Sequence, residues 1–133
     1  CLTFVTPYVK RVVDALQDDS FIVVLHNCGN TGACTQAMLA TGARAHHFGD
    51  KIDMLAALEQ LPRDVIGMGN LSPVTVFRMG NAREVKKATL ELLRRTADYN
   101  NFIISSGCDT PPHSPIENFD AFFEAVQEFN KEG

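Results

Sequence analysis

This sequence of 133 residues has no tryptophan, only four cysteines and no long run of apolar residues. Its apolar runs are far shorter than the roughly 18 residues that a membrane-spanning helix needs, and no signal peptide is recognisable. These absences predict a cytoplasmic protein with no membrane partner. Four cysteines are also too few for the disulfide scaffold of a small secreted domain.

Positive charge is also scarce in this chain. The 12 Lys and Arg are outnumbered by 16 Asp and Glu, which gives a net charge of −4. Nucleic-acid binding requires clustered Lys and Arg, and here the basic residues are scattered, so no nucleic-acid partner is expected. The length and the 45% hydrophobic content fit one globular unit over residues 1–133. Because the chain begins at Cys1 and has no initiating Met, we expect it to be a piece of a longer protein.

One short apolar run, from Phe21 to Leu25, leads directly to His26 and Cys28 and then breaks at Gly29. Side chains alternate along a strand, so His26 and Cys28 point to the same side. An imidazole and a thiol therefore arrive together at one end of the predicted strand. Such a pair is half of a metal site.

A second apolar run, from Phe102 to Ser106, also breaks at a glycine and ends on Cys108. If the two strands run parallel in one sheet, Cys108 meets His26 and Cys28 at the carboxyl edge. Three nitrogen and sulfur ligands with an open fourth position are typical of catalytic zinc. The alternative is a buried histidine with inert core cysteines, which Cys108 alone would fit. The position of all three residues at strand ends favours the metal site.

Strand and helix patterns alternate along the chain. Strands are predicted over residues 21–25, 43–48, 64–68 and 102–106. A first helix is predicted from Thr6 up to Asp18, and further helices over residues 33–40, 50–61, 73–77 and 81–98 and from residue 114 onward, with Thr6, Asp50, Asn81 and Ser114 as N-caps. Alternating strands and helices imply an α/β fold of parallel βα units. Four such units are half of a TIM (β/α)8 barrel, which normally needs about 250 residues.

Three motifs carry a resemblance to a known family. They are His26-Asn-Cys28-Gly-Asn, Gly67-Met-Gly69-Asn70-Leu-Ser-Pro73 and Ser106-Gly107-Cys108-Asp-Thr-Pro-Pro-His-Ser-Pro-Ile-Glu-Asn118, in this order. With them, the chain from Pro7 onward resembles the C-terminal half of the uroporphyrinogen decarboxylase superfamily. The combination of His-x-Cys with a distant Gly-Cys is similar to the methylcobamide:coenzyme M methyltransferase branch. The resemblance implies the C-terminal half of a TIM barrel.

The same resemblance implies a function. In that branch the matching residues, here His26, Cys28 and Cys108, hold a zinc that activates an acceptor thiol such as coenzyme M. The methyl donor is a methylated corrinoid, and a corrinoid protein is the expected partner because nothing here resembles a corrinoid-binding loop. Asn70 and Asn118 are the candidate substrate-binding residues, although asparagine is equally common at turns and helix starts.

Two other functions remain open at this point. One is a uroporphyrinogen decarboxylase of porphyrin and heme biosynthesis, which needs no metal and relies on acidic and arginine residues of an N-terminal half that this sequence does not include. The other is a non-catalytic module that interacts with a corrinoid protein. In one departure from the family pattern, Gly49 stands about where members commonly carry an acidic residue, and Asp50 is its neighbour.

The remaining histidines and cysteines are weaker candidates. Cys34 is predicted to be a core residue of a helix, and Cys1 is interpreted as the cut end of the chain. His46 and His47 lie on opposite faces of a predicted strand, so at most one of them faces the site, and a structural or surface role is favoured for both. His113 lies in a proline-rich loop, where it either contacts substrate or is solvated.

Half a barrel exposes surfaces that a complete barrel hides. Its two outermost strands have unpaired N–H and C=O groups, and its inner face is predicted to be lined by Ile22, Val24 and Ile103. A two-fold dimer is the simplest closed arrangement that covers both. The isolated chain is therefore expected to be inactive and dimeric.

Overall fold

The computed structural model describes residues 2–30 and 32–132. Its parallel four-stranded sheet has the order β1-β2-β3-β4. The strands are β1 (Val24–Asn27), β2 (Ala45–Phe48), β3 (Ile66–Leu71) and β4 (Phe102–Ser106). The helices are α1 (Thr6–Leu16), α2 (Thr35–Leu39), α3 (Met54–Leu58), α4 (Ala82–Arg95) and α5 (Ile116–Glu132), with a 3-10 turn η1 (Gly32–Cys34) and a π-helical segment η2 (Pro73–Arg78). The predicted parallel βα units are therefore confirmed.

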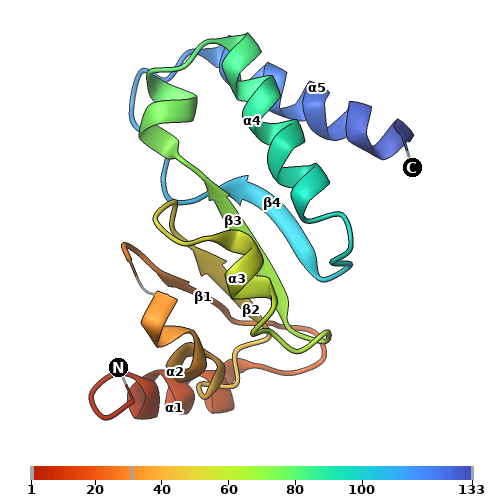
Figure 1. The fold of residues 1–133 in the computed structure, drawn as a ribbon. Helices are drawn as coiled ribbons and strands as arrows, with labels where there is room; N and C mark the ends of the chain where they lie inside the picture. The colour runs from red at the N-terminus through yellow and green to blue at the C-terminus, as the bar shows by residue number, and fades with distance from the viewer. Residues whose placement is uncertain (1, 31, 133) are drawn as a thin grey trace.

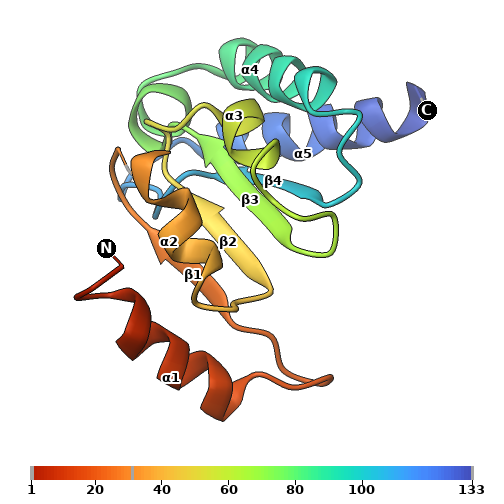
Figure 2. The same ribbon diagram turned by 60° about the horizontal axis from the view of Figure 1, so that its bottom comes forward.

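The helices cover one face of the sheet. Figure 2 shows α2 and α3 lying over this face, and α4 packs with α5 beside β4 (Figures 1 and 2). Phe48 from β2 and Leu71 from β3 pack there against Leu58 of α3 and Val85 of α4, and all four are buried. Burying such side chains away from water is the main stabilisation of the fold.

The opposite face of the sheet carries the apolar side chains predicted for a barrel interior. Val24 on β1 is 47% exposed and Ile103 on β4 is 48% exposed, and Ile22, just before β1, is 43% exposed. Within the described residues, β1 pairs only with β2 and β4 only with β3. The sheet therefore has two free edges and one uncovered face.

Helix α1 lies beyond the β1 edge, where it contacts α2 (Figures 1 and 2). The Thr6 hydroxyl donates a hydrogen bond to the carbonyl of Ala37 in α2 at 2.9 Å, and Val13 is buried. The other side of α1 leaves Tyr8, Val12 and Leu16 exposed. This helix is therefore amphipathic, and part of its apolar surface is exposed.

Three strands begin later than predicted, at Val24, Ala45 and Ile66, because local turns occupy the residues before them. The Asp18 carboxylate accepts hydrogen bonds from the amides of Ser20 and Phe21, which closes a turn, so β1 starts at Val24 and includes His26. The amide of Val65 likewise donates to the carbonyl of Pro62, and β3 starts at Ile66.

The helix starts show both correct and wrong cap predictions. Asn81 caps α4 in a complete capping box with Glu84, as predicted. Asp50 is not the cap of α3, because the Asp53 carboxylate accepts from the first free amides of that helix. Ser114 lies two residues before α5 begins and donates its hydroxyl to the carbonyl of Pro111.

One further side-chain prediction fails, and another residue lies outside the described residues. Cys34 is only half-buried at the end of η1 and is disulfide-bonded. Cys1, interpreted as the cut end, is not among the described residues. No helix in the described part of the chain has both the length and the apolar character needed to cross a membrane.

The uncovered face and free edges lead to a prediction about the 133-residue chain by itself. It should self-associate, and light scattering at micromolar concentration should give about twice the monomer mass. Val24→Lys places a charge on the exposed edge strand and should shift the mass toward the monomer.

Met79→Lys is the matched control, because Met79 is 75% exposed but lies at the end of η2, outside the sheet. It should leave the dimer intact. A monomer that unfolds in a sharp thermal transition would contradict this interpretation of the sheet face.

Candidate metal centre

The structure brings together all three predicted metal ligands. The Nε2 atom of His26 lies 2.8 Å from the Sγ atom of Cys28, and that sulfur lies 3.2 Å from the Sγ atom of Cys108. The three donor atoms all lie within 4.8 Å of one another. His26 belongs to β1, Cys28 follows the same strand, and Cys108 follows β4.

The two thiols of the cluster are free and interact with each other. The hydrogen bond to Cys108 raises the pKa of the Cys28 thiol, and desolvation raises it further. The neighbouring thiol thus opposes ionisation of Cys28 when no cation is near. A bound divalent metal reverses this effect, because a coordinating thiol gives up its proton to the metal's charge.

The donor set fits zinc. Tetrahedral zinc with bonds of about 2.0 to 2.3 Å separates its nitrogen and sulfur ligands by about 3.5 to 3.8 Å. Small side-chain rotations from the observed 2.8 and 3.2 Å separations would reach those values. One imidazole and two thiolates are also soft ligands, which zinc accepts readily. His26 and Cys28 are exposed, so a further ligand has access from solvent.

A backbone contact orients the His26 ring. Its Nδ1 atom lies 3.2 Å from the carbonyl oxygen of His47 on the neighbouring strand. A carbonyl only accepts, so Nδ1 carries the proton in this contact and Nε2 offers its lone pair to the cysteines. This is the usual way in which a protein fixes the tautomer of a metal-binding histidine.

Glycines let the strand-end loops approach closely enough to assemble the cluster. A Cβ atom on Gly107 would lie 2.7 Å from the backbone nitrogen of Asp50, and one on Gly49 would lie 3.3 Å from the backbone nitrogen of Gly29. The loops after β1, β2 and β4 therefore touch backbone to backbone. Gly107 also donates its amide to the carbonyl of Leu71 at 2.7 Å, which anchors the loop that carries Cys108.

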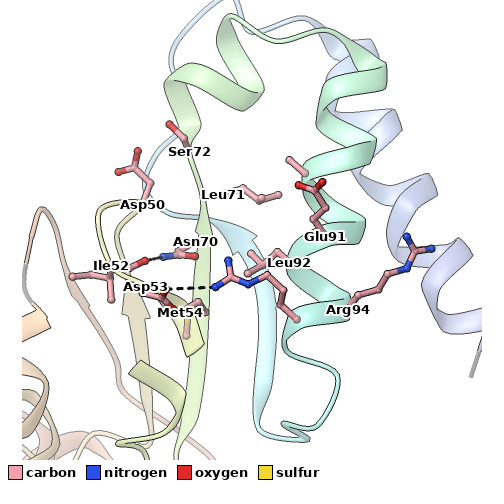
Figure 3. Close-up of a pocket in the computed structure, with 12 residues that line it drawn as sticks. Asp50, Ile52, Asp53, Met54, Asn70, Leu71, Ser72, Glu91, Leu92 and Arg94 are labelled. Carbon is pink, nitrogen blue, oxygen red and sulfur yellow. Dashed lines mark hydrogen bonds and ion pairs between the residues drawn. The ribbon is translucent and has the colours of Figure 1, made fainter. Parts of the chain in front are cut away.

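Asn70, predicted to contact substrate, supports a loop next to the cluster. Its amide nitrogen donates to the carbonyls of Gly49 and Ile52 at 3.0 and 2.6 Å. Asn70 also lines a groove of about 550 Å³ between the start of α3 and α4, where Arg95 pairs with Asp53 at 3.4 Å (Figure 3). The structure therefore gives Asn70 a loop-supporting contact, and a role in substrate binding stays a prediction.

Asn118, the other predicted substrate residue, is not brought to the cluster. It is fully buried and donates its amide to the carbonyls of Phe77 and Gly80, which join η2 to α5. A side chain enclosed in this way cannot reach a substrate at the strand ends without unpacking. Asn118 is therefore left out of the proposed site.

The structure separates the roles of the other histidines. His46 is fully buried, and this burial lowers its pKa. His47 is half-buried, and its ring centroid lies 4.6 Å from that of His26. His113 is an exposed loop residue with a left-handed φ of 62°. His47 is thus a neighbour of the cluster that sequence analysis did not select. Because side chains alternate along a strand, one of His46 and His47 had to point to this face. The strand register was needed to identify His47 as that residue.

Comparisons with known proteins agree with this fold. The profile of the family described as uroporphyrinogen decarboxylase (URO-D) matches residues 2–129. The chain is 28% identical to the methylcobamide:CoM methyltransferase MtbA of Methanosarcina acetivorans, over 95% of this chain and 36% of that protein. It is 33% identical to a uroporphyrinogen decarboxylase of Synechococcus sp. (strain CC9605), over 92% of this chain and 34% of that protein.

A solved structure gives the same picture of the fold. The chain superposes on a methyltransferase from Methanosarcina mazei with a TM-score of 0.83 at 23% identity, over 96% of this chain and 36% of that one. The architecture is therefore that of a (β/α)8 barrel protein, of which this chain forms four consecutive βα units. It belongs to the uroporphyrinogen decarboxylase (URO-D) family. It spans about a third of the length of the curated relatives it matches, 36% and 34%.

The close approach at Gly107 gives a testable consequence. Gly107→Ala forces a Cβ atom against the backbone of Asp50 and should destabilise the protein by about 1 to 3 kcal/mol in urea unfolding. It should also displace Cys108 and reduce metal content.

Gly32→Ala is the matched control. A Cβ atom there meets only the Cδ1 atom of Ile52, at an ordinary 3.8 Å, so neither stability nor metal content should fall. If the two variants behave alike, the backbone approach at Gly107 is not what assembles the cluster.

Proposed function

We propose that the protein is a zinc-dependent methyltransferase that moves a methyl group from a methylated corrinoid to a thiol acceptor such as coenzyme M. The observation that carries the proposal is the cluster of His26, Cys28 and Cys108, whose donor atoms lie within 4.8 Å of one another. The similarity to a relative named methylcobamide:CoM methyltransferase supports it. The corrinoid is expected to arrive on a partner protein.

Each ligand has a defined part in this proposal. His26 presents Nε2 because its Nδ1 is held by the carbonyl of His47, and Cys28 and Cys108 supply the two sulfur donors. A zinc ion at these residues would lower the pKa of a bound acceptor thiol, so that it is a thiolate at neutral pH. Two thiolate ligands would donate electron density to the zinc ion, which makes it a mild Lewis acid and keeps the acceptor sulfur nucleophilic.

The transfer itself balances without any redox partner. The acceptor sulfur attacks the methyl carbon, the carbon–sulfur bond forms, and the cobalt–carbon bond breaks with both electrons left on cobalt. The chain's part is to place the acceptor at the open edge of the cluster, where His26 and Cys28 are exposed. The methylated corrinoid, which is the methyl donor, approaches from that side.

A uroporphyrinogen decarboxylase is the second candidate, because the 33% identical relative carries that name. That reaction has no use for two cysteines and a histidine in contact at strand ends. The cluster therefore favours methyl transfer.

A non-catalytic module that binds a corrinoid protein is the third candidate. Turnover by the protein in its full natural length separates this candidate from the methyltransferase.

The first prediction from this proposal concerns metal content. The purified protein in its full natural length should contain about one zinc per chain, and Cys28→Ser and Cys108→Ser should each lose most of it, because each removes one of three donors. Elemental analysis after gel filtration is the measurement.

His113→Asn is the control for that experiment, since it removes a histidine from an exposed loop and asparagine tolerates the left-handed backbone there. It should retain its zinc. Equal zinc in the parent protein and both serine variants would refute the assignment of the ligands.

The second prediction concerns the reaction. The protein in its full natural length should demethylate methylcobalamin in the presence of coenzyme M, and the loss of methylcobalamin absorption measures the reaction. Treatment with a chelator, or Cys108→Ser, should lower the rate at least about 100-fold, because the acceptor is then no longer activated as a thiolate.

The same preparation should leave uroporphyrinogen unchanged. Decarboxylation that survives the chelator, with no methyl transfer, would reverse the order of the two candidates. The absence of both activities, with zinc bound, would favour the interaction module.

A further inference from the structure

His47 contacts both arms of the cluster. One arm is the β1 end, with His26 and Cys28, and the other is the β4 end, with Cys108. The main-chain carbonyl of His47 holds the Nδ1 atom of His26 at 3.2 Å. The side chain of the same residue reaches the other arm, because its Nε2 atom lies 2.7 Å from the carbonyl oxygen of Ser106.

The bond to Ser106 defines the protonation of the His47 ring. The carbonyl oxygen only accepts, so Nε2 is a donor here. The hydroxyl of Ser105 lies 3.2 Å from the same nitrogen and itself donates to Ser106 at 3.0 Å. The N–H of His47 is therefore shared between two oxygens of β4, which defines the direction of the ring.

Further hydrogen bonds connect this contact to Cys108. The Ser106 hydroxyl donates to the carbonyl of Cys108 at 2.7 Å, and the amide of Gly107 donates to Leu71 at 2.7 Å. The segment from Ser106 to Cys108 is thus held by one hydrogen bond within it and by hydrogen bonds to His47 and Leu71. The His47 ring provides the connection that leads back to the His26 arm.

The reach of this contact is unusual for a sheet. His47 lies on β2 and Ser106 on β4, with β3 between them. In a flat sheet two inter-strand steps measure about 9.5 Å, too far for an imidazole to bridge to a main-chain oxygen. The contact therefore exists only because the sheet curves toward the face that carries the cluster, and the ring helps to hold that curvature at its carboxyl edge.

We propose that His47 is a positioning residue that sets the separation between Cys108 and the pair formed by His26 and Cys28. The inference rests on the proposed function, because it treats the cluster as a metal site. Loss of the imidazole leaves the three ligands in place but frees the β4 arm to move away from the β1 arm. The site then binds metal more weakly and with a different geometry.

The test compares two variants of similar size in the protein in its full natural length. His47→Leu fills the space but has no N–H, whereas the amide of His47→Gln can still donate to Ser106. Chelator-treated protein is titrated with cobalt(II), whose visible absorption reports thiolate ligation and geometry, and zinc then competes for the site. His47→Leu should bind about 10- to 100-fold more weakly, with a shifted cobalt spectrum, and His47→Gln should recover most of the affinity and the parent spectrum.

Unfolding in urea separates positioning from simple stabilisation. If His47 only stabilises the fold, His47→Leu lowers the free energy of unfolding but keeps the parent cobalt spectrum and affinity, and the inference is overturned. If His47→Leu does not fold, His47→Met decides, because it also lacks an N–H that could donate to Ser106. A several-fold loss of affinity with a shifted spectrum supports the inference, and parent values overturn it.

The matched control is again His113→Asn, which should bind cobalt as the parent protein does. The outcomes also separate this inference from the proposed function. Parent protein that binds no metal would contradict the proposed function itself. Parent protein that binds metal, with His47→Leu indistinguishable from it, would contradict only the role of His47.

Discussion

The contact between the sulfur atoms of Cys28 and Cys108 constrains the shape of the whole chain. The two cysteines follow β1 and β4, the outermost strands of the sheet. Three inter-strand steps in a flat sheet would separate these strands by about 14 Å, yet the sulfurs lie 3.2 Å apart. The sheet must therefore curve, and its loops must reach inward. Helices α2 and α3 lie over one face of the sheet (Figure 2), and the side chains of Val24 and Ile103 are exposed on the other.

The parts of this arrangement that sequence analysis predicted depend on local patterns. His26 and Cys28 share a side because side chains alternate along an extended chain, and that rule needs no knowledge of the fold. Cys108 could be added because parallel strands place their carboxyl ends at one edge of a sheet. The capping box at Asn81 is equally local. Together with the alternation of strands and helices, these patterns were enough for the fold class and the cluster.

The parts that were missed depend on contacts between distant residues or on side chains that compete for the same role. Asp53 rather than Asp50 caps α3, and both are acidic residues a few positions before the helix. Asn118 is enclosed through carbonyls 38 and 41 residues away in the chain. His47 contacts the cluster through Ser106, 59 residues away. No periodicity in the sequence encodes such pairs, because they follow from strand register and sheet curvature.

The same barrel fold occurs in relatives named for methyl transfer and in relatives named for decarboxylation. The fold alone therefore does not determine the reaction. The difference must come from the strand ends. Adjacent thiols raise the pKa of Cys28, so their contact is unfavourable for ionisation unless a cation compensates. The protein nevertheless brings them together through Gly107, whose close backbone approach excludes a side chain, and orients His26 toward them through a backbone hydrogen bond. Three independent local features thus converge on one small volume, and a metal ligand function accounts for all of them at once.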